Sequence, residues 1–81
     1  MRLRGRRRSL VTREPSFPDG LSEREVDVLR LIAAGRSNPQ IADELVISRN
    51  TVQNHVSSIL TKAGLANRAE AVAYALRRDL V

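Results

Sequence analysis

One segment of this 81-residue chain, Ile41 to Leu60, constrains the fold more than any other. In its first half the apolar residues are spaced i, i+1 and i+4, and in its second half i, i+4, i+7 and i+8, as the buried faces of two helices require. These residues are Ile41, Ala42 and Leu45, then Val52, Val56, Ile59 and Leu60. Only a short polar turn around Ile47 separates the two halves. Such a pair predicts a helix-turn-helix, whose second helix enters the DNA major groove.

Capping residues predict where the helices begin and end. The first helix begins with the capping box of Ser22 and Glu25 and ends at Gly35. A third helix is expected over residues 49–63, where Ser48 caps its start, and a fourth after Asn67. Four helices with short connections and no strand pattern predict an all-α domain with a central helix-turn-helix and no wing.

The start of the second helix has two interpretations. Ser37 and Gln40 fit a capping box, which makes Ser37 the cap. Pro39, however, disfavours helical geometry at the preceding residue, which makes Asn38 the cap instead. The sequence leaves both interpretations open.

Charge and composition restrict the class of protein. The net charge is +5, and residues 1–20 supply most of it, because they hold six arginines against two carboxylates. The chain has no cysteine, which excludes disulfides and thiolate metal sites. It also lacks an apolar run of the length that a membrane span or a signal peptide needs. We expect a cytoplasmic protein that binds no metal, cofactor, small molecule or membrane.

Residues 1–20 lack a sustained apolar period and contain Pro15, Pro18 and Gly20. They are therefore expected to form a basic, flexible tail or linker ahead of a domain at residues 21–81. Their arginines suit an arm that lies in the DNA minor groove. Alternatively they are only a linker, or the remnant of a longer protein. The chain is accordingly either a natural single-domain protein or an excised effector domain.

Many residues between Leu21 and Val81 match the pattern of a known family in one continuous order. They are Arg24, Glu25, Leu29, Gly35, Arg36, Ser37, Asn38, Ile41, Ala42, Ile47, Ser48, Thr51, Val52, His55, Val56, Ile59, Leu60, Lys62, Arg68, Glu70 and Ala71. On these residues the segment resembles the LuxR/NarL/FixJ-type DNA-binding domain of bacterial transcription regulators. The resemblance implies a sequence-specific transcription regulator. Because one recognition helix reads only a few base pairs, we expect the protein to bind paired half-sites as a dimer. Many members carry a regulatory domain upstream, commonly a phosphorylated receiver or a small-molecule sensor.

The polar face of the third predicted helix supplies the candidate base contacts. Asparagine and glutamine can pair bidentately with adenine, and a good pair is worth about 1–3 kcal/mol of discrimination. The resembling family usually has lysine in place of Gln53, so we expect weaker affinity here and a preference moved from guanine toward adenine. The alternative is that these amides are only solvated surface residues. The candidate base contacts are Asn50, Gln53, Asn54 and Ser57.

Phosphate contacts are expected near the starts of the second and third helices, where free N–H groups favour anions. Thr51 can instead merely cap its helix, and Arg68 can be a solvated charge. His55 lacks the partners that catalysis or metal binding requires, so it is expected to pack or to contact phosphate. Lys62 is expected to pair with Glu25 or with the helix C-terminus. The candidate phosphate contacts are Ser37, Asn38, Gln40, Ser48, Arg49, Thr51, His55 and Arg68.

The resemblance implies a dimer contact on the fourth helix. Its candidate residues cover more than one stripe of that helix, so an alternative is that Val72 and Ala75 complete the core while Tyr74 is incidental. A small contact between alanines would leave the monomer dominant without DNA. The candidate dimer residues are Ala71, Val72, Tyr74, Ala75 and Arg78.

Two other functions compete with a DNA-binding regulator. The first is a module similar to region four of sigma factors, which would act with RNA polymerase as its partner. The second is a protein-interaction domain, which the weak charge of residues 21–81 and Gln53 in place of lysine favour. An enzyme is not expected, because the sequence holds no nucleophile–base pair, metal cluster or phosphate loop.

Overall fold

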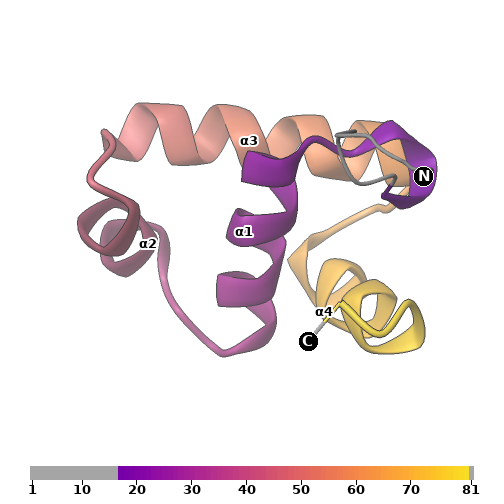
Figure 1. Ribbon diagram of the computed structural model, residues 1–81. Helices are drawn as coiled ribbons and strands as arrows, with labels where there is room; N and C mark the ends of the chain where they lie inside the picture. Colours follow the sequence, from indigo (N-terminus) through magenta and orange to yellow (C-terminus); the bar gives the residue numbers. More distant parts are fainter. Residues whose placement is uncertain (1–16, 81) are drawn as a thin grey trace, which may run out of the picture.

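The computed structural model describes residues 17–80, which form a short 3-10 turn and four α-helices (Figure 1). In this range no strand occurs, which confirms the all-α prediction. Helix α3 packs across α1, and α1 lies between α2 and α4 beneath it (Figure 1). The elements are η1 (Pro18–Gly20), α1 (Glu23–Ala33), α2 (Asn38–Leu45), α3 (Arg49–Ala63) and α4 (Arg68–Arg77).

Side chains cap the starts of the helices as the sequence predicts. At α1 the Ser22 hydroxyl accepts the Glu25 N–H at 3.1 Å, and the Glu25 carboxylate accepts the Ser22 N–H at 2.8 Å. At α2 the same reciprocal pair forms between Ser37 and Gln40, which settles Ser37 rather than Asn38 as the cap. Each start is therefore fixed by residues three positions apart.

The turn between α2 and α3 has an unusual backbone. Val46 ends α2 with φ 57° and ψ 51°, a left-handed conformation that β-branched residues rarely adopt. Its side chain is 88% exposed, whereas Ile47 is half-buried and packs against the core. Ile47 thus fills the angle between the two helices, and Val46 bears the strain of the turn.

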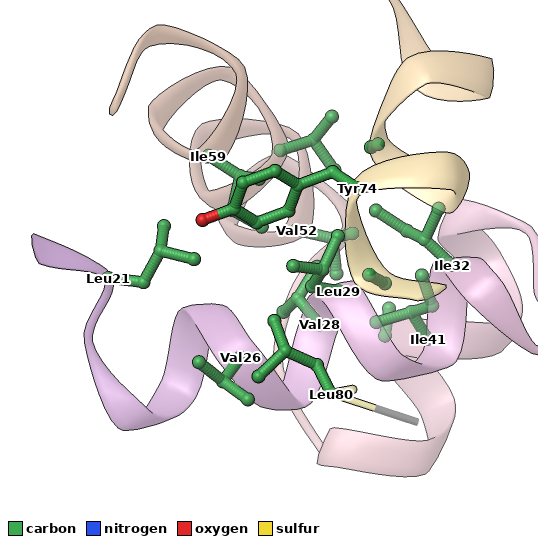
Figure 2. Close-up of a cluster of buried hydrophobic side chains, with 14 residues drawn as sticks. Leu21, Val26, Val28, Leu29, Ile32, Ile41, Val52, Ile59, Tyr74 and Leu80 are labelled. Carbon is green, nitrogen blue, oxygen red and sulfur yellow. The ribbon is translucent and has the colours of Figure 1, made fainter. Parts of the chain in front are cut away.

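A single apolar cluster holds the helices together (Figure 2). The ring of Tyr74 lies among the aliphatic side chains of the cluster, with its oxygen at the edge (Figure 2). This placement shows that the inner face of α4 completes the core. The buried apolar residues are Leu21, Val26, Val28, Leu29, Ile32, Ile41, Ala42, Val52, Val56, Ile59, Ala71, Tyr74, Ala75 and Leu80.

The expected boundary between linker and domain at residue 20 needs correction. Phe17 packs against the core, and the side chain of Asp19 accepts a hydrogen bond from the Tyr74 hydroxyl at 2.7 Å. The Gly20 carbonyl accepts a hydrogen bond from Lys62 at 3.3 Å. Residues 17–20 are therefore part of the folded domain, and the remainder of the expected tail lies outside the described residues.

Within residues 17–80, none of the helices combines the length and the apolar character that crossing a membrane requires.

Candidate nucleic-acid interface

Helix α3 separates apolar and polar residues onto opposite faces. Val52, Val56 and Ile59 are buried against the rest of the domain. The four candidate base contacts are all exposed, and their spacing along the helix places them on one outward face. The structure thus brings together Asn50, Gln53, Asn54 and Ser57.

Gln53, in the middle of this face, is held by polar neighbours on both sides. Its Oε1 accepts a hydrogen bond from the Asn38 Nδ2 group at 3.2 Å. Its Nε2 group lies 3.5 Å from the Ser57 hydroxyl, one turn further along α3. Gln53 therefore links the start of α2 to the exposed face of α3.

Arg68, at the start of α4, is not a solvated charge. One guanidinium nitrogen donates to Asn38 Oδ1 at 2.7 Å, and the other donates to the Arg36 carbonyl at 2.6 Å. Both bonds join α4 to the segment that enters α2. The phosphate contact by Arg68 stays a prediction, and its guanidinium has hydrogen-bond partners within the domain.

The start of α3 places several candidate phosphate contacts together. The Ser48 hydroxyl accepts the Thr51 N–H at 3.0 Å and lies 2.8 Å from the Thr51 hydroxyl. Thr51 is half-buried and takes part in capping, while Arg49 and Asn50 are exposed. Helical geometry leaves the N–H groups of the first turn without carbonyl partners. This end of α3 can therefore accept an anion next to an arginine.

The remaining candidate phosphate contacts lie beside this region. Ser37 and Gln40 are exposed at the start of α2, where their side chains form the capping box. His55 is half-buried on the flank of α3. In the part of the chain that the structure describes, no group of three or more His, Asp or Glu side chains could hold a metal ion.

The rear of α3 is fixed by a buried carboxylate. Glu25 is only 5% exposed and accepts hydrogen bonds from Lys62 at 2.8 Å and from the Ser58 hydroxyl at 2.5 Å. Burial alone would raise the pKa of Glu25, but the bonds from Lys62, the Ser22 N–H and Ser58, with the charge of Lys62, lower it to about 2. The expected pairing of Lys62 with Glu25 is confirmed. The contribution of Ser58 was missed, because a serine in a helix carries no pattern that points to a distant carboxylate.

The expected dimer residues need correction at three positions. Ala71, Tyr74 and Ala75 are at most 2% exposed, because they pack in the core of their own domain. Burial and the hydrogen bond to Asp19, with the charge of Asp19, raise the pKa of Tyr74 to about 12. Arg78 is exposed, but it lies over the Tyr74 ring, 5.5 Å from its centre.

The outer face of α4 carries other apolar residues. Leu76 is 59% exposed. Ala69 and Ala73 lie on the same stripe and are exposed, and Val72 beside them is half-buried. This outer stripe is the apolar surface that α4 leaves exposed.

Comparisons with known proteins agree with this arrangement. The family of bacterial regulatory proteins named luxR matches residues 19–75. The oxygen regulatory protein NreC of Staphylococcus aureus strain JH9 is 46% identical over 61 residues, which cover 75% of this chain and 28% of that protein. The same figures hold for NreC of strain NCTC 8325. This chain therefore spans little more than a quarter of the length of these curated relatives.

A solved structure leads to the same family. The response regulator ChrA, of a heme-sensing two-component system, superimposes with a TM-score of 0.71 at 37% sequence identity. The match covers 84% of this chain and 33% of the ChrA chain. The chain belongs to the luxR family of bacterial regulatory proteins and carries its helix-turn-helix DNA-binding domain.

Proposed function

We propose that this protein regulates transcription by binding specific sequences of double-stranded DNA with α3 in the major groove. The observation that carries the proposal is the exposed face of α3, whose central residues carry amide and hydroxyl groups rather than long charged side chains. Amides at the first turns of a recognition helix suit the donor and acceptor pattern of base edges. The proposed base contacts are Asn50, Gln53, Asn54 and Ser57.

The proposed phosphate contacts surround that face. The first turns of α2 and α3 offer N–H groups to phosphate oxygens, and Arg49 adds a positive charge. Such contacts fix the position of the domain on the duplex without reading sequence. Besides Arg49, the proposed residues are Ser37, Asn38, Gln40, Ser48, Thr51 and His55, with Arg68 acting through Asn38.

We further propose that two copies bind paired half-sites through α4. The outer stripe of Ala69, Val72, Ala73 and Leu76 supports this proposal, because small residues permit close approach and Leu76 exposes a large apolar side chain. One recognition helix reads only a few base pairs, so pairing of half-sites extends the sequence that is read. RNA polymerase bound nearby is the proposed partner through which DNA binding changes transcription. The proposed location of the protein is the bacterial cytoplasm.

The experiment that tests this function is selection of bound sequences from a random duplex pool at near-physiological salt. We expect a motif of two half-sites with a fixed spacing. The same selection with a chain that lacks residues 1–16 separates the contribution of the arginine-rich segment from that of the domain. Binding that is independent of sequence and disappears with that segment would contradict the proposal and favour a protein-interaction role.

A further inference from the structure

A chain of hydrogen bonds runs from the start of α4, through the start of α2, to the centre of the exposed face of α3. It comprises the side chains of Arg68, Asn38, Gln53 and Ser57. We propose that Arg68 and Asn38 are positioning residues that decide which base Gln53 reads, by turning its amide so that an N–H group faces the DNA. This inference rests on the function proposed above.

The chain begins at Arg68 because a guanidinium group can only donate hydrogen bonds. The atom of Asn38 that lies 2.7 Å from the Arg68 nitrogen must therefore be its oxygen. A second bond, from Arg68 to the Arg36 carbonyl at 2.6 Å, holds the guanidinium in place. Together these bonds fix the orientation of the Asn38 amide, which in isolation could face either way.

The orientation of the Asn38 amide in turn determines that of the Gln53 amide. With its oxygen turned to Arg68, Asn38 presents its Nδ2 donor to α3, and the group it meets must be an acceptor. Gln53 Oε1 occupies that place at 3.2 Å. The Nε2 group of Gln53 then lies toward Ser57, at 3.5 Å from the hydroxyl, with a second N–H still to donate.

A glutamine held in this way can no longer pair with a base through both groups of its amide. Pairing with adenine uses the oxygen and the nitrogen of the amide together, and here the oxygen is turned toward α2. The N–H that remains suits acceptor atoms, which guanine offers at N7 and O6 and thymine at O4, whereas adenine offers N7 beside the N6 donor, which calls for an acceptor in the protein. Gln53 thus presents a donor, as the lysine usual in the family does. The expected move toward adenine is therefore replaced by a preference for guanine or thymine.

Exclusion of water strengthens this arrangement when DNA is bound. Gln53 is exposed, so water competes for its hydrogen bonds in the free protein. In a closed groove the local dielectric constant is lower, and a satisfied network of polar groups becomes more rigid. The orientation set by Arg68 is therefore maintained where base readout takes place.

The substitution Asn38→Asp gives the sharpest test. An aspartate still accepts from Arg68 but can only accept from Gln53, so the Gln53 amide should turn its nitrogen inward and its oxygen to the DNA. The substitution Gln53→Ala identifies the base pair that Gln53 contacts, because the base preference is lost there. At that base pair we expect Asn38→Asp to change the preferred base from guanine or thymine to adenine or cytosine. Each preference should be about fivefold, the size of one net hydrogen bond.

A matched control separates this reversal from the effect of the added negative charge. Gln40→Glu adds the same charge in the same helical turn and keeps the capping box with Ser37. It should weaken binding to all sequences alike and leave the preferred base unchanged. Arg68→Met, which frees the Asn38 amide, should reduce the preference at this base pair below twofold, with circular dichroism to verify folding.

The outcomes distinguish this inference from the proposed function. A specific motif with guanine or thymine at the Gln53 position, reversed only by Asn38→Asp, supports the inference. A specific motif with adenine at that position, or one that Asn38→Asp leaves unchanged, overturns the inference while DNA reading stands. The absence of any motif with the unmodified chain overturns the proposed function, and this inference with it.

Discussion

Lys62 Nζ lies 2.8 Å from Glu25 Oε1 and thereby joins the last turn of α3 to the first turn of α1. The same carboxylate accepts the N–H of Ser22, so it caps α1 and pairs with α3 at once. Because the Glu25 side chain is 7% exposed and that of Lys62 is 38% exposed, the pair lies at the margin of the core. This contact ties the end of α3 to the start of α1.

The low pKa of Glu25 predicts a loss of stability in acid. Its pKa is lowered from 4.5 to about 2 in the folded protein, so the ionised form stabilises the fold. That stability is present above pH 4.5, decreases as the pH falls toward 2, and amounts to about 3 kcal/mol at most. Urea unfolding across this range measures it. Glu25→Gln should make the free energy of unfolding depend less steeply on pH in this range. An equally steep dependence for that variant would show that Glu25 is not the group responsible.

Tyr74 is the only tyrosine of the chain, so its ionisation can be followed directly by near-ultraviolet absorbance. Burial and the bond to Asp19 raise its pKa to about 12, and the neutral ring should persist well above pH 10. The associated stability is complete below pH 10 and is lost as the pH rises through 12. Asp19→Asn should bring the titration to lower pH. Ionisation of the unmodified chain near pH 10 would mean that the ring is not buried.

Val46→Gly should stabilise the domain. Val46 has φ 57°, where its branched side chain is strained and 88% exposed, so that little packing is lost on its removal. Glycine adopts this conformation freely, and we expect a gain of about 0.5–1 kcal/mol in the free energy of unfolding. Val46→Ala is the matched control, because alanine keeps most of the steric penalty. Equal stability of the two variants would contradict this account.

Asn54 and Arg49 should affect DNA binding in different ways. Asn54→Ala removes a proposed base contact, so the preference at one base pair should fall by about 1–3 kcal/mol. Arg49→Ala removes a proposed phosphate contact, so all sequences should be bound more weakly. The slope of log affinity against log salt concentration should decrease in magnitude by about one. Titrations of matched and mismatched duplexes at several salt concentrations measure both effects. Equal and uniform losses for both variants would show that Asn54 reads no base.

Leu76→Glu should separate dimerisation from base reading. Leu76 is 59% exposed on the outer stripe of α4, and a carboxylate there would oppose its own copy across a symmetric contact. We expect about a tenfold loss of affinity for duplexes with paired half-sites. A duplex with one half-site serves as the internal control and should bind as before. Equal losses on both duplexes would assign Leu76 to the stability of the monomer.

The helix boundaries could be predicted from the sequence because the chemistry that sets them is local. Helix α3 begins at Arg49 and ends at Ala63 as expected, since Ser48 caps its start and Gly64 takes the left-handed conformation after its end. The pairing of Lys62 with Glu25 was also expected. The orientation of the fourth helix was harder to predict. Its apolar residues cover more than one stripe, so spacing alone did not show that Leu76 faces outward.

The contacts that span the chain could not be predicted. Tyr74 meets Asp19 across 55 positions, and Arg68 meets Asn38 across 30, and neither pair has a pattern in the sequence. The strain at Val46 was equally hidden, because a valine gives no indication of a left-handed backbone. For the same reason residues 17–20 were assigned to the linker, since their packing depends on partners distant in sequence.

The side-chain caps of the helices also bear on how the domain acquires its structure. Each of the four α-helices in the described range begins at a side chain that accepts an N–H three residues later. Nucleation is the costly step of helix formation, and here the residues that favour it are near neighbours in the chain. Helical domains dominated by local contacts typically fold within microseconds to milliseconds, far faster than a ribosome adds residues. The exposed face of α3 can therefore take its folded form almost as soon as α4 has been synthesised.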